Sequence, residues 1–164
     1  MIEIVGDFWQ EIKRKASYDR YDAIVCTTNC VVKSDKTLVM GKGIASDFLK
    51  HFPWLAQTWG AKVNIKKPSV LVEDIRFCLD KTILWKYRVS FLVALPTKLY
   101  WQDSSTIDLV VQSCKQLEII TTALNWKSLL MTRPGCGCGG LQWHHIKSKL
   151  ESILDDRFTI ITKD

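Results

Sequence analysis

The sequence lacks long apolar runs and linker-like stretches. No apolar run approaches the roughly 20 residues that a membrane-spanning helix needs. The first residues, Met1-Ile2-Glu3-Ile4-Val5, do not have the pattern of a signal peptide. Internal repeats and low-complexity segments are also absent. We therefore expect a single domain over residues 1–164, located in the cytoplasm of the cell that makes or hosts it, with no membrane partner.

Composition and charge are those of a globular domain with an anionic partner. Hydrophobic residues make up 47% of the chain and charged residues 24%, and 164 residues suffice for a full core. A chain of this size needs no disulfides, so we expect the six cysteines to be reduced thiols. Cys26 and Cys30 with Cys136 and Cys138 have poor zinc spacing, and we expect no metal and no cofactor. The net charge of +6 favours phosphates of a small ligand or nucleic acid.

Glycine is scarce and concentrated in one place. Half of the eight glycines lie within residues 135–140, between the apolar run Trp126 to Met131 and the helix-patterned segment Trp143 to Leu154. A glycine-rich turn between a strand and a helix lets the backbone approach a ligand and directs free N–H groups at it, which suits phosphate. The spacing matches neither the P-loop nor the dinucleotide fingerprint. By position alone, a purely structural turn remains an alternative.

Strand and helix patterns alternate along the chain. Apolar runs predict strands near residues 2–5, 21–28, 127–132 and 158–162, with further strand signals over 69–79 and 83–95. Within the latter, 70–72 and 75–77 predict a hairpin or meander, and 89–95 predicts a buried central strand. Helical patterns occupy 8–12, 44–52, 54–59, 105–117 and 143–154, and Ser105 with Asp108 fits a capping box. The alternation predicts an α/β fold with a mixed sheet.

Four loops follow predicted strands and carry chemically useful groups. They are Gly6-Asp7, Asn29 with Met40 to Ile44, Pro96-Thr97-Lys98, and Gly135 to Gly140. Open α/β sheets bind ligands outside the carboxyl ends of their strands, so parallel strands would bring these loops to one rim. Together the loops offer a carboxylate, an amide, two lysines and two glycine turns. This set suits a molecule with a diphosphate, sugar hydroxyls and a purine.

The same motifs, in this order, resemble a macro domain. The similarity rests on Gly6-Asp7, the strand end at Asn29, Met40 to Ala45, Pro96 to Trp101 and Gly135 to Trp143, and covers essentially the whole chain. It implies a three-layer α/β/α fold with a central mixed sheet, and an ADP-ribose ligand. The chain most resembles the branch of the DNA-ADP-ribose glycohydrolase antitoxin and the terminal ADP-ribose glycohydrolase. It is also similar to phage-encoded macro domains, which makes a phage-infected host cell one candidate setting.

The resemblance assigns roles to individual residues. It implies that Asp7 accepts a hydrogen bond from the adenine amino group, that Phe8 or Trp9 flanks the base, and that Asn29 holds the distal ribose. Lys98 aligns with the lysine that acts at the anomeric carbon, so Lys98 and Asn29 are the expected catalytic residues. The remaining ligand contacts come from Met40, Gly41, Lys42, Gly43, Ile44, Thr97, Gly135, Cys136, Gly137, Cys138, Gly139, Gly140 and Leu141.

Two positions depart from the family pattern. Gly139 stands where the terminal glycohydrolase has a catalytic aspartate, and Cys26 stands where many macro domains have asparagine. Structural alternatives also stay open: Asp7 as a helix cap, Lys98 as a solvated lysine, and Trp101 in the core or on a base or sugar. A histidine-activated Cys136 or Cys138 is a further alternative.

The expected function is binding of ADP-ribose derivatives and hydrolysis of a bond at the distal ribose. The acceptor would be a nucleic acid, a protein or a small group, and ADP-ribosylated nucleic acid suits the basic charge of the chain. Two rival functions are a phosphatase acting on ADP-ribose 1″-phosphate and a non-catalytic module that binds or sequesters ADP-ribose-type nucleotides.

Overall fold

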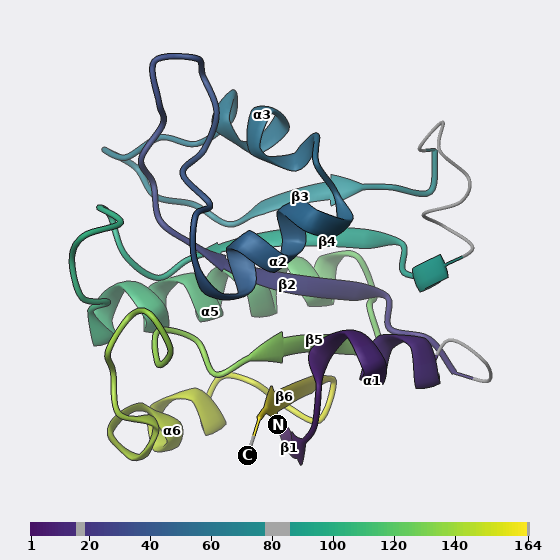
Figure 1. Ribbon diagram of the computed structural model, residues 1–164. Helices are drawn as coiled ribbons and strands as arrows, with labels where there is room; N and C mark the ends of the chain where they lie inside the picture. Colours follow the sequence, from purple (N-terminus) through teal and green to yellow (C-terminus); the bar gives the residue numbers. More distant parts are fainter. Residues whose placement is uncertain (16–18, 78–85, 164) are drawn as a thin grey trace.

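The fold is built around one six-stranded sheet. The computed structural model describes residues 1–15, 19–77 and 86–163 (Figure 1). The sheet has the order β1-β6-β5-β2-β4-β3. Its strands are β1 (Ile2–Val5), β2 (Ala23–Thr28), β3 (Leu71–Asp74), β4 (Phe91–Pro96), β5 (Leu129–Thr132) and β6 (Phe158–Thr162). The helices are α1 (Phe8–Lys15), α2 (Gly43–His51), α3 (Leu55–Gly60), α5 (Ile107–Ala123) and α6 (Trp143–Glu151).

The strand directions determine where the loops meet. β1, β6, β5, β2 and β4 run parallel, and only β3 is antiparallel to its neighbour β4. At the centre, Val25 pairs with Val93 on one side and with Met131 on the other. The loops that follow the five parallel strands therefore emerge at a single edge of the sheet. The mixed sheet is confirmed, and so is the shared rim.

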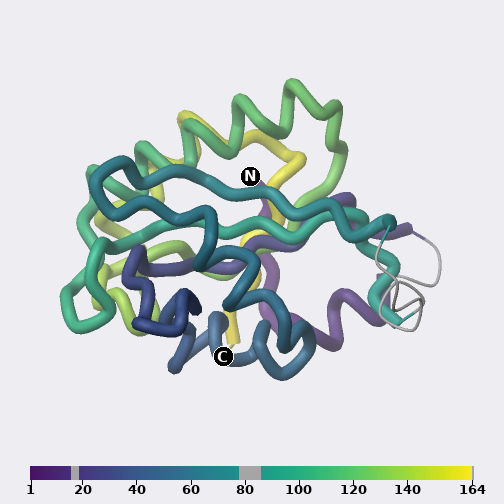
Figure 2. Tube along the Cα trace, turned by 90° about the horizontal axis from the view of Figure 1, so that it is seen from above, coloured from purple at the N-terminus to yellow at the C-terminus, as the bar shows by residue number. Residues whose placement is uncertain are grey.

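Helices cover both faces of the sheet and make three layers. Along β2, Ile24 and Cys26 pack with buried residues of α1, α2 and α3, whereas Ala23 and Val25 pack with those of α5 and α6. Figure 2 shows this arrangement edge-on, with the blue helices α2 and α3 below the strands and the green helix α5 above them. Because alternate side chains of a strand point to opposite faces, a continuous apolar run serves both cores. The expected three-layer α/β/α architecture is confirmed.

The expectation of a strand at residues 75–77 is wrong. The strand β3 pairs with β4, and the chain turns after Asp74. An oxygen of the Asp74 carboxylate accepts hydrogen bonds from the Arg76 backbone N–H and from its guanidinium, each at 3.0 Å. Aspartate side chains that bond backbone two residues ahead favour turns over strands. Residues 78–79 and 83–85 of the predicted strand segments lie outside the described residues.

The start of α5 also differs from the expected capping box. The N-cap is Thr106, whose Oγ1 accepts from the Leu109 N–H at 3.3 Å. The Ser105 hydroxyl is buried and has no hydrogen-bond partner in the structure. Ser105 instead contributes its backbone N–H, which donates to the Gly139 carbonyl at 2.8 Å. Between residues 1 and 163, leaving aside 16–18 and 78–85, no helix is long and apolar enough to cross a membrane.

Candidate functional site

A cleft of about 900 Å³ lies at the carboxyl edge of the parallel strands. It is bounded by the segments after β2, β4, β5 and β6 and by the first turn of α2. All but two of the residues that the sequence assigned to the ligand line this cleft. They are Asn29, Met40, Gly41, Lys42, Gly43, Ile44, Thr97, Lys98, Gly135, Cys136, Gly137, Cys138, Gly139, Gly140 and Leu141. The structure thus brings these residues together, and their roles toward a ligand stay predictions.

Asp7 and Phe8, the other two assigned residues, line an adjoining cavity of about 230 Å³. This cavity and the large cleft share Gly43, Ile44 and Lys163 among their lining residues. The shared residues make the two spaces neighbours. A long ligand can therefore extend from Asp7 at one end to Lys98 at the other.

The loop after β5 has the geometry that only glycine allows at several positions. Gly135 and Gly140 both have a φ of +76°, in the left-handed region. Gly139 is confined by packing: a Cβ built on it would lie 2.2 Å from Ser105 Oγ and 2.3 Å from the Gly135 carbonyl oxygen. The loop closes on itself because the Leu141 N–H donates to the Gly135 carbonyl at 3.0 Å. A side chain at position 139, including a catalytic carboxylate, would require a different loop path.

The two glycine turns touch each other across the cleft. Gly43 opens α2 with a φ of +59°, and a Cβ there would lie 3.2 Å from the sulfur of Cys138. No side chain caps the N-terminus of α2, nor that of α6, whose N-cap residue Gln142 also lines the cleft. The first N–H groups of a helix lack intrahelical partners and favour anions. Two helix N-termini without side-chain caps thus face one cleft.

Asn29 is anchored at the end of β2 by both ends of its amide. Its Nδ2 donates to the Val39 carbonyl at 2.7 Å, and its Oδ1 accepts from the Val31 N–H at 2.9 Å. Asn29 is buried and lines the cleft. An amide nitrogen has a second hydrogen and an amide oxygen a second lone pair, so Asn29 retains capacity for a ligand. The Asn29 side chain therefore has a structural role, and each of its two polar atoms can still form one more hydrogen bond.

Lys98 is held by three backbone carbonyls. Its Nζ donates to Cys138 O at 2.8 Å, to Asp103 O at 2.9 Å and to Trp101 O at 3.3 Å. A lysine ammonium has three donors and no acceptor, so this arrangement uses all of them and matches the charged form. Lys98 is therefore held in place by the fold while partly exposed, and its catalytic role stays a prediction. Lys98 ties the loop after β4 to the glycine loop.

The cleft is cationic. Its lining includes Lys42, Lys98, Arg133 and Lys163, and none of the described residues that line it is an aspartate or a glutamate. A concave surface of one charge sign concentrates ligands of the opposite sign. The cleft consequently favours an anionic ligand and offers no carboxylate for acid–base chemistry.

Asp7 does cap a helix, but only with one of its oxygens. Oδ1 accepts from the N–H groups of Trp9 and Gln10 at 3.0 Å each, and Oδ2 lies 3.2 Å from Lys163 Nζ. The Gln10 N–H, followed by Lys163, lowers the pKa of Asp7 below its usual range. The carboxylate is thus charged at neutral pH, which makes it an acceptor only and a suitable partner for an amino group. Phe8 is buried and meets the Trp9 ring edge-on at 5.2 Å between centroids.

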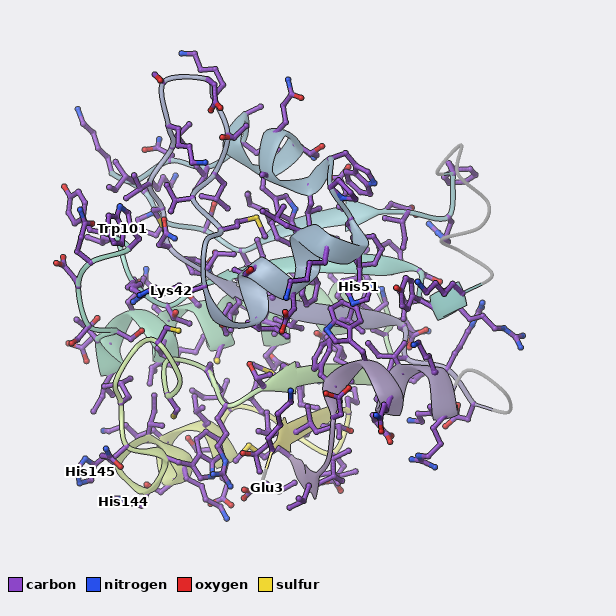
Figure 3. The ribbon with its side chains drawn as sticks, in the orientation of Figure 1. Glu3, Lys42, His51, Trp101, His144 and His145 are labelled. Atoms are coloured by element: carbon purple, nitrogen blue, oxygen red, sulfur yellow. The ribbon has the colours of Figure 1, made fainter. Side chains whose placement is uncertain are left out.

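A cysteine nucleophile activated by histidine is not assembled here. His144 and His145 are exposed on α6, contact each other, and lie outside the residues that line the cleft (Figure 3). Burial raises the pKa of Cys136, and it raises that of Cys30 to about 11. These thiols are therefore protonated at neutral pH. The five cysteines among the described residues are free, as expected for reduced thiols.

The cleft lining also includes Arg133, Trp143 and Lys163, to which the sequence assigned no role toward the ligand. The Arg133 guanidinium lies 5.2 Å from the centre of the Trp143 ring, and the Trp143 N–H donates to Glu3 Oε2 at 3.0 Å. Glu3 also pairs with Lys147, which is the main cause of its lowered pKa. Lys163 follows β6 and lines both cavities. The sequence could have pointed to Arg133 and Lys163, because each directly follows a predicted strand and should therefore lie at the same rim.

The architecture and the position of the cleft define the class of protein. The structure superposes on the macrodomain of Thermus aquaticus DarG with a TM-score of 0.71 and 23% identity, covering 99% of this chain and 97% of that one. For the macrodomain of Mycobacterium tuberculosis DarG the TM-score is 0.69 at 23% identity, with 99% of each chain covered. The fold is that of a macro domain, as the sequence motifs predicted.

Sequence similarity specifies the branch. The chain is 28% identical over 134 residues to the DNA ADP-ribosyl glycohydrolase of Thermus aquaticus, and 29% identical over 135 residues to that of Mycobacterium tuberculosis. These matches cover 82% and 81% of this chain but 34% and 35% of the relatives, so the chain spans about a third of their length. Thermosipho africanus DarTG in complex with ADP-ribose has the same fold, with a TM-score of 0.73 at 21% identity, covering 100% of this chain and 42% of that one. No family model matches the chain. The sequence is thus similar to the DarG branch of macro domains.

Proposed function

We propose that this macro domain binds ADP-ribose in the cleft and hydrolyses the bond between its distal ribose and an acceptor. The observation that carries the proposal is the cleft itself, which combines two helix N-termini without side-chain caps with four cations and no carboxylate among its described lining residues; two of these cations, Arg133 and Lys163, pair with Glu3 and Asp7 outside the lining. A diphosphate fits such a surface, and Asp7 in the neighbouring cavity suits an adenine amino group. The similarity to DNA ADP-ribosyl glycohydrolases supports the same ligand.

The proposed acceptor is a nucleic acid. The sequence relatives are named for DNA, and the net charge of +6 favours a polyanion. In the reaction, the bond from the anomeric carbon to the acceptor breaks and the acceptor leaves with a proton from an acid of the protein. The hydroxyl of a water joins the anomeric carbon, and the other proton of that water returns to the acid. Positive charge that develops on the ribose is stabilised by the bound diphosphate.

Lys98 is the proposed proton donor to the departing acceptor. Its Nζ is oriented by three carbonyls, and it lines the cleft but not the adjoining cavity that holds Asp7. Asn29 would orient the distal ribose with its remaining hydrogen-bond capacity. A positioned acid typically contributes about 10²- to 10⁴-fold to a rate. Loss of Lys98 should therefore slow turnover by that factor.

Two substitutions at Lys98 separate chemistry from positioning. Lys98→Ala removes the donor, and Lys98→Arg keeps the charge and the hydrogen bonds but does not release a proton near neutral pH. We expect both variants to lose turnover of an ADP-ribosylated single-stranded oligonucleotide while calorimetry still detects ADP-ribose binding. Lys115→Ala, an exposed lysine on α5 outside the cleft, is the matched control. Full turnover by Lys98→Arg would contradict proton transfer from Lys98.

A second candidate function is binding without catalysis. It is favoured by the same three carbonyls, because they occupy every donor of Lys98 in the structure. A substrate panel decides between the candidates: ADP-ribosylated oligonucleotide, ADP-ribosylated protein and ADP-ribose 1″-phosphate. Turnover of the phosphate alone would identify a phosphatase. Micromolar ADP-ribose binding with no turnover of any substrate would identify a binder.

A further inference from the structure

Three consecutive large apolar side chains are exposed beside the cleft. Leu99 is 38% exposed, Tyr100 50% and Trp101 51%. Elsewhere in the described residues, large exposed apolar side chains occur singly along the chain, as Ile119 does on α5. Single exposed apolar residues are normal, whereas a contiguous group marks a binding surface. Trp101 itself lines the cleft, so core packing does not account for this ring.

The backbone that carries these side chains is fixed on both sides. The Leu99 carbonyl accepts from the Cys30 N–H at 2.9 Å, and the Tyr100 carbonyl accepts from the Asp103 N–H at 3.3 Å. The Trp101 carbonyl accepts from Lys98 Nζ at 3.3 Å. Every carbonyl from 99 to 101 is therefore bonded. The exposed indole is presented by an ordered loop, which lowers the entropy lost when a ligand binds it.

The charge around Trp101 suits an anionic chain. Lys42 and Lys98 line the same cleft, and Figure 3 shows Lys42 and Trp101 on the same side of the molecule. Within the described part of the chain, no ion pair engages Lys42. Asp103 is the only carboxylate of the loop 97–104, and it does not line the cleft. A flat aromatic ring in the same cleft as Lys42, a lysine that forms no ion pair with the described residues, is the combination that binds single-stranded nucleic acid.

We propose that Trp101 is the platform on which the base of the acceptor nucleotide stacks. The inference rests on the proposed function, because it places the acceptor at the Lys98 end of the cleft. The Trp101 carbonyl accepts from Lys98 Nζ, and both residues line the same cleft, so an acceptor that leaves the anomeric carbon near Lys98 has Trp101 within the same wall. Stacking needs an open base face, which a single strand offers and a paired duplex does not. Trp101 therefore selects a base-linked, single-stranded acceptor over a protein.

The test compares substrates in wild type, Trp101→Ala, Trp101→Phe and the control Ile119→Ala, an exposed apolar residue on α5. The substrates are an oligonucleotide ADP-ribosylated on a base and an ADP-ribosylated protein. Since stacking on an aromatic contributes a factor of roughly 5 to 150 per base, Trp101→Ala should lower kcat/KM on the oligonucleotide by that factor. Trp101→Phe should recover most of the loss, and turnover of the protein should not change.

A binding experiment keeps the inference separate from catalysis. In the Lys98→Arg background, which keeps the hydrogen bonds that hold the loop, Trp101→Ala should raise the Kd of the ADP-ribosylated oligonucleotide by the same roughly 5- to 150-fold, and that of free ADP-ribose by less than about twofold. Equal effects on both ligands, or on oligonucleotide and protein turnover, would overturn the platform. Absence of turnover in the wild type would contradict the proposed function, and the binding comparison would still decide the role of Trp101.

Discussion

Replacing Gly139 by alanine should destabilise the protein and distort the loop that lines the cleft. The new methyl group would lie 2.2 Å from Ser105 Oγ and 2.3 Å from the Gly135 carbonyl oxygen, and both distances are far below any real contact. The second obstacle is backbone within the same loop, so no rotamer change relieves it. The loop must move, and the hydrogen bond from Ser105 N–H to the Gly139 carbonyl is the bond most exposed to that movement.

The expected destabilisation combines two contributions. Overpacking costs about 1–3 kcal/mol, and the lost hydrogen bond adds about 1 kcal/mol. The free energy of unfolding should therefore fall by about 2–4 kcal/mol for Gly139→Ala. In a domain of this size that corresponds to a drop in Tm of roughly 4–16 °C. Affinity for ADP-ribose should fall as well, because the displaced loop lines the cleft.

Gly137 is the matched control in the same loop. A Cβ at Gly137 meets nothing within 4 Å, and its φ lies outside the left-handed region. Differential scanning fluorimetry should give Gly137→Ala a Tm within about 2 °C of wild type, since surface substitutions usually change stability by less than about 0.5 kcal/mol. If Gly139→Ala melted at the wild-type temperature with unchanged calorimetric affinity, the close packing of Gly139 would be refuted.

Two further substitutions test features away from this loop. Thr106→Ala should lower the free energy of unfolding by about 1 kcal/mol, because it removes the N-cap of α5. Ser105→Ala should leave the free energy of unfolding nearly unchanged, because the Ser105 hydroxyl has no hydrogen-bond partner in the structure. Urea denaturation measures both variants, and equal losses would contradict the assignment of Thr106 as the cap. Glu3→Gln should destabilise the protein at neutral pH. The pKa of Glu3 is lowered, chiefly by Lys147, so its stabilisation is present above its ordinary value of 4.5 and is lost as pH falls through the folded value. Thermal unfolding at pH 7, 5 and 3.5 should show the gap between variant and wild type closing at the lowest pH, and a gap independent of pH would contradict the assignment.

Much of the fold could be predicted because its signals are local. The apolar run Ala23-Ile24-Val25-Cys26 is a two-faced buried strand, and the glycine loop opens α6 where the pattern changes from strand to helix. The expected rim formed because the strands before Asn29 and Lys98 are parallel neighbours. A strand was wrongly predicted at residues 75–77 because Ile75 and Phe77 are residue types that favour strands, whereas the Asp74 side chain stabilises a turn there. The predicted N-cap of α5 was wrong by one residue, because serine and threonine are both common N-cap residues and the sequence does not distinguish Ser105 from Thr106.

The roles of the cleft residues were less predictable because they depend on contacts between distant segments. Nothing in Pro96-Thr97-Lys98 shows that the lysine reaches the Cys138 carbonyl, 40 residues further along the chain. The sequence likewise does not reveal that Asp7 pairs with Lys163. The need for glycine at position 139 also becomes clear only from the packing of Ser105 against the loop.

The glycine turns have a consequence for how this cleft tolerates sequence change. Gly43, Gly135 and Gly140 need left-handed backbone and Gly139 needs space, so the shape of the wall is set by residues without side chains. Almost any side-chain substitution elsewhere in the wall leaves the backbone N–H donors in place. Recognition of a phosphate can therefore persist while the neighbouring side chains diverge. A lineage of such domains could exchange one reaction for another, or lose it, and still hold the same nucleotide.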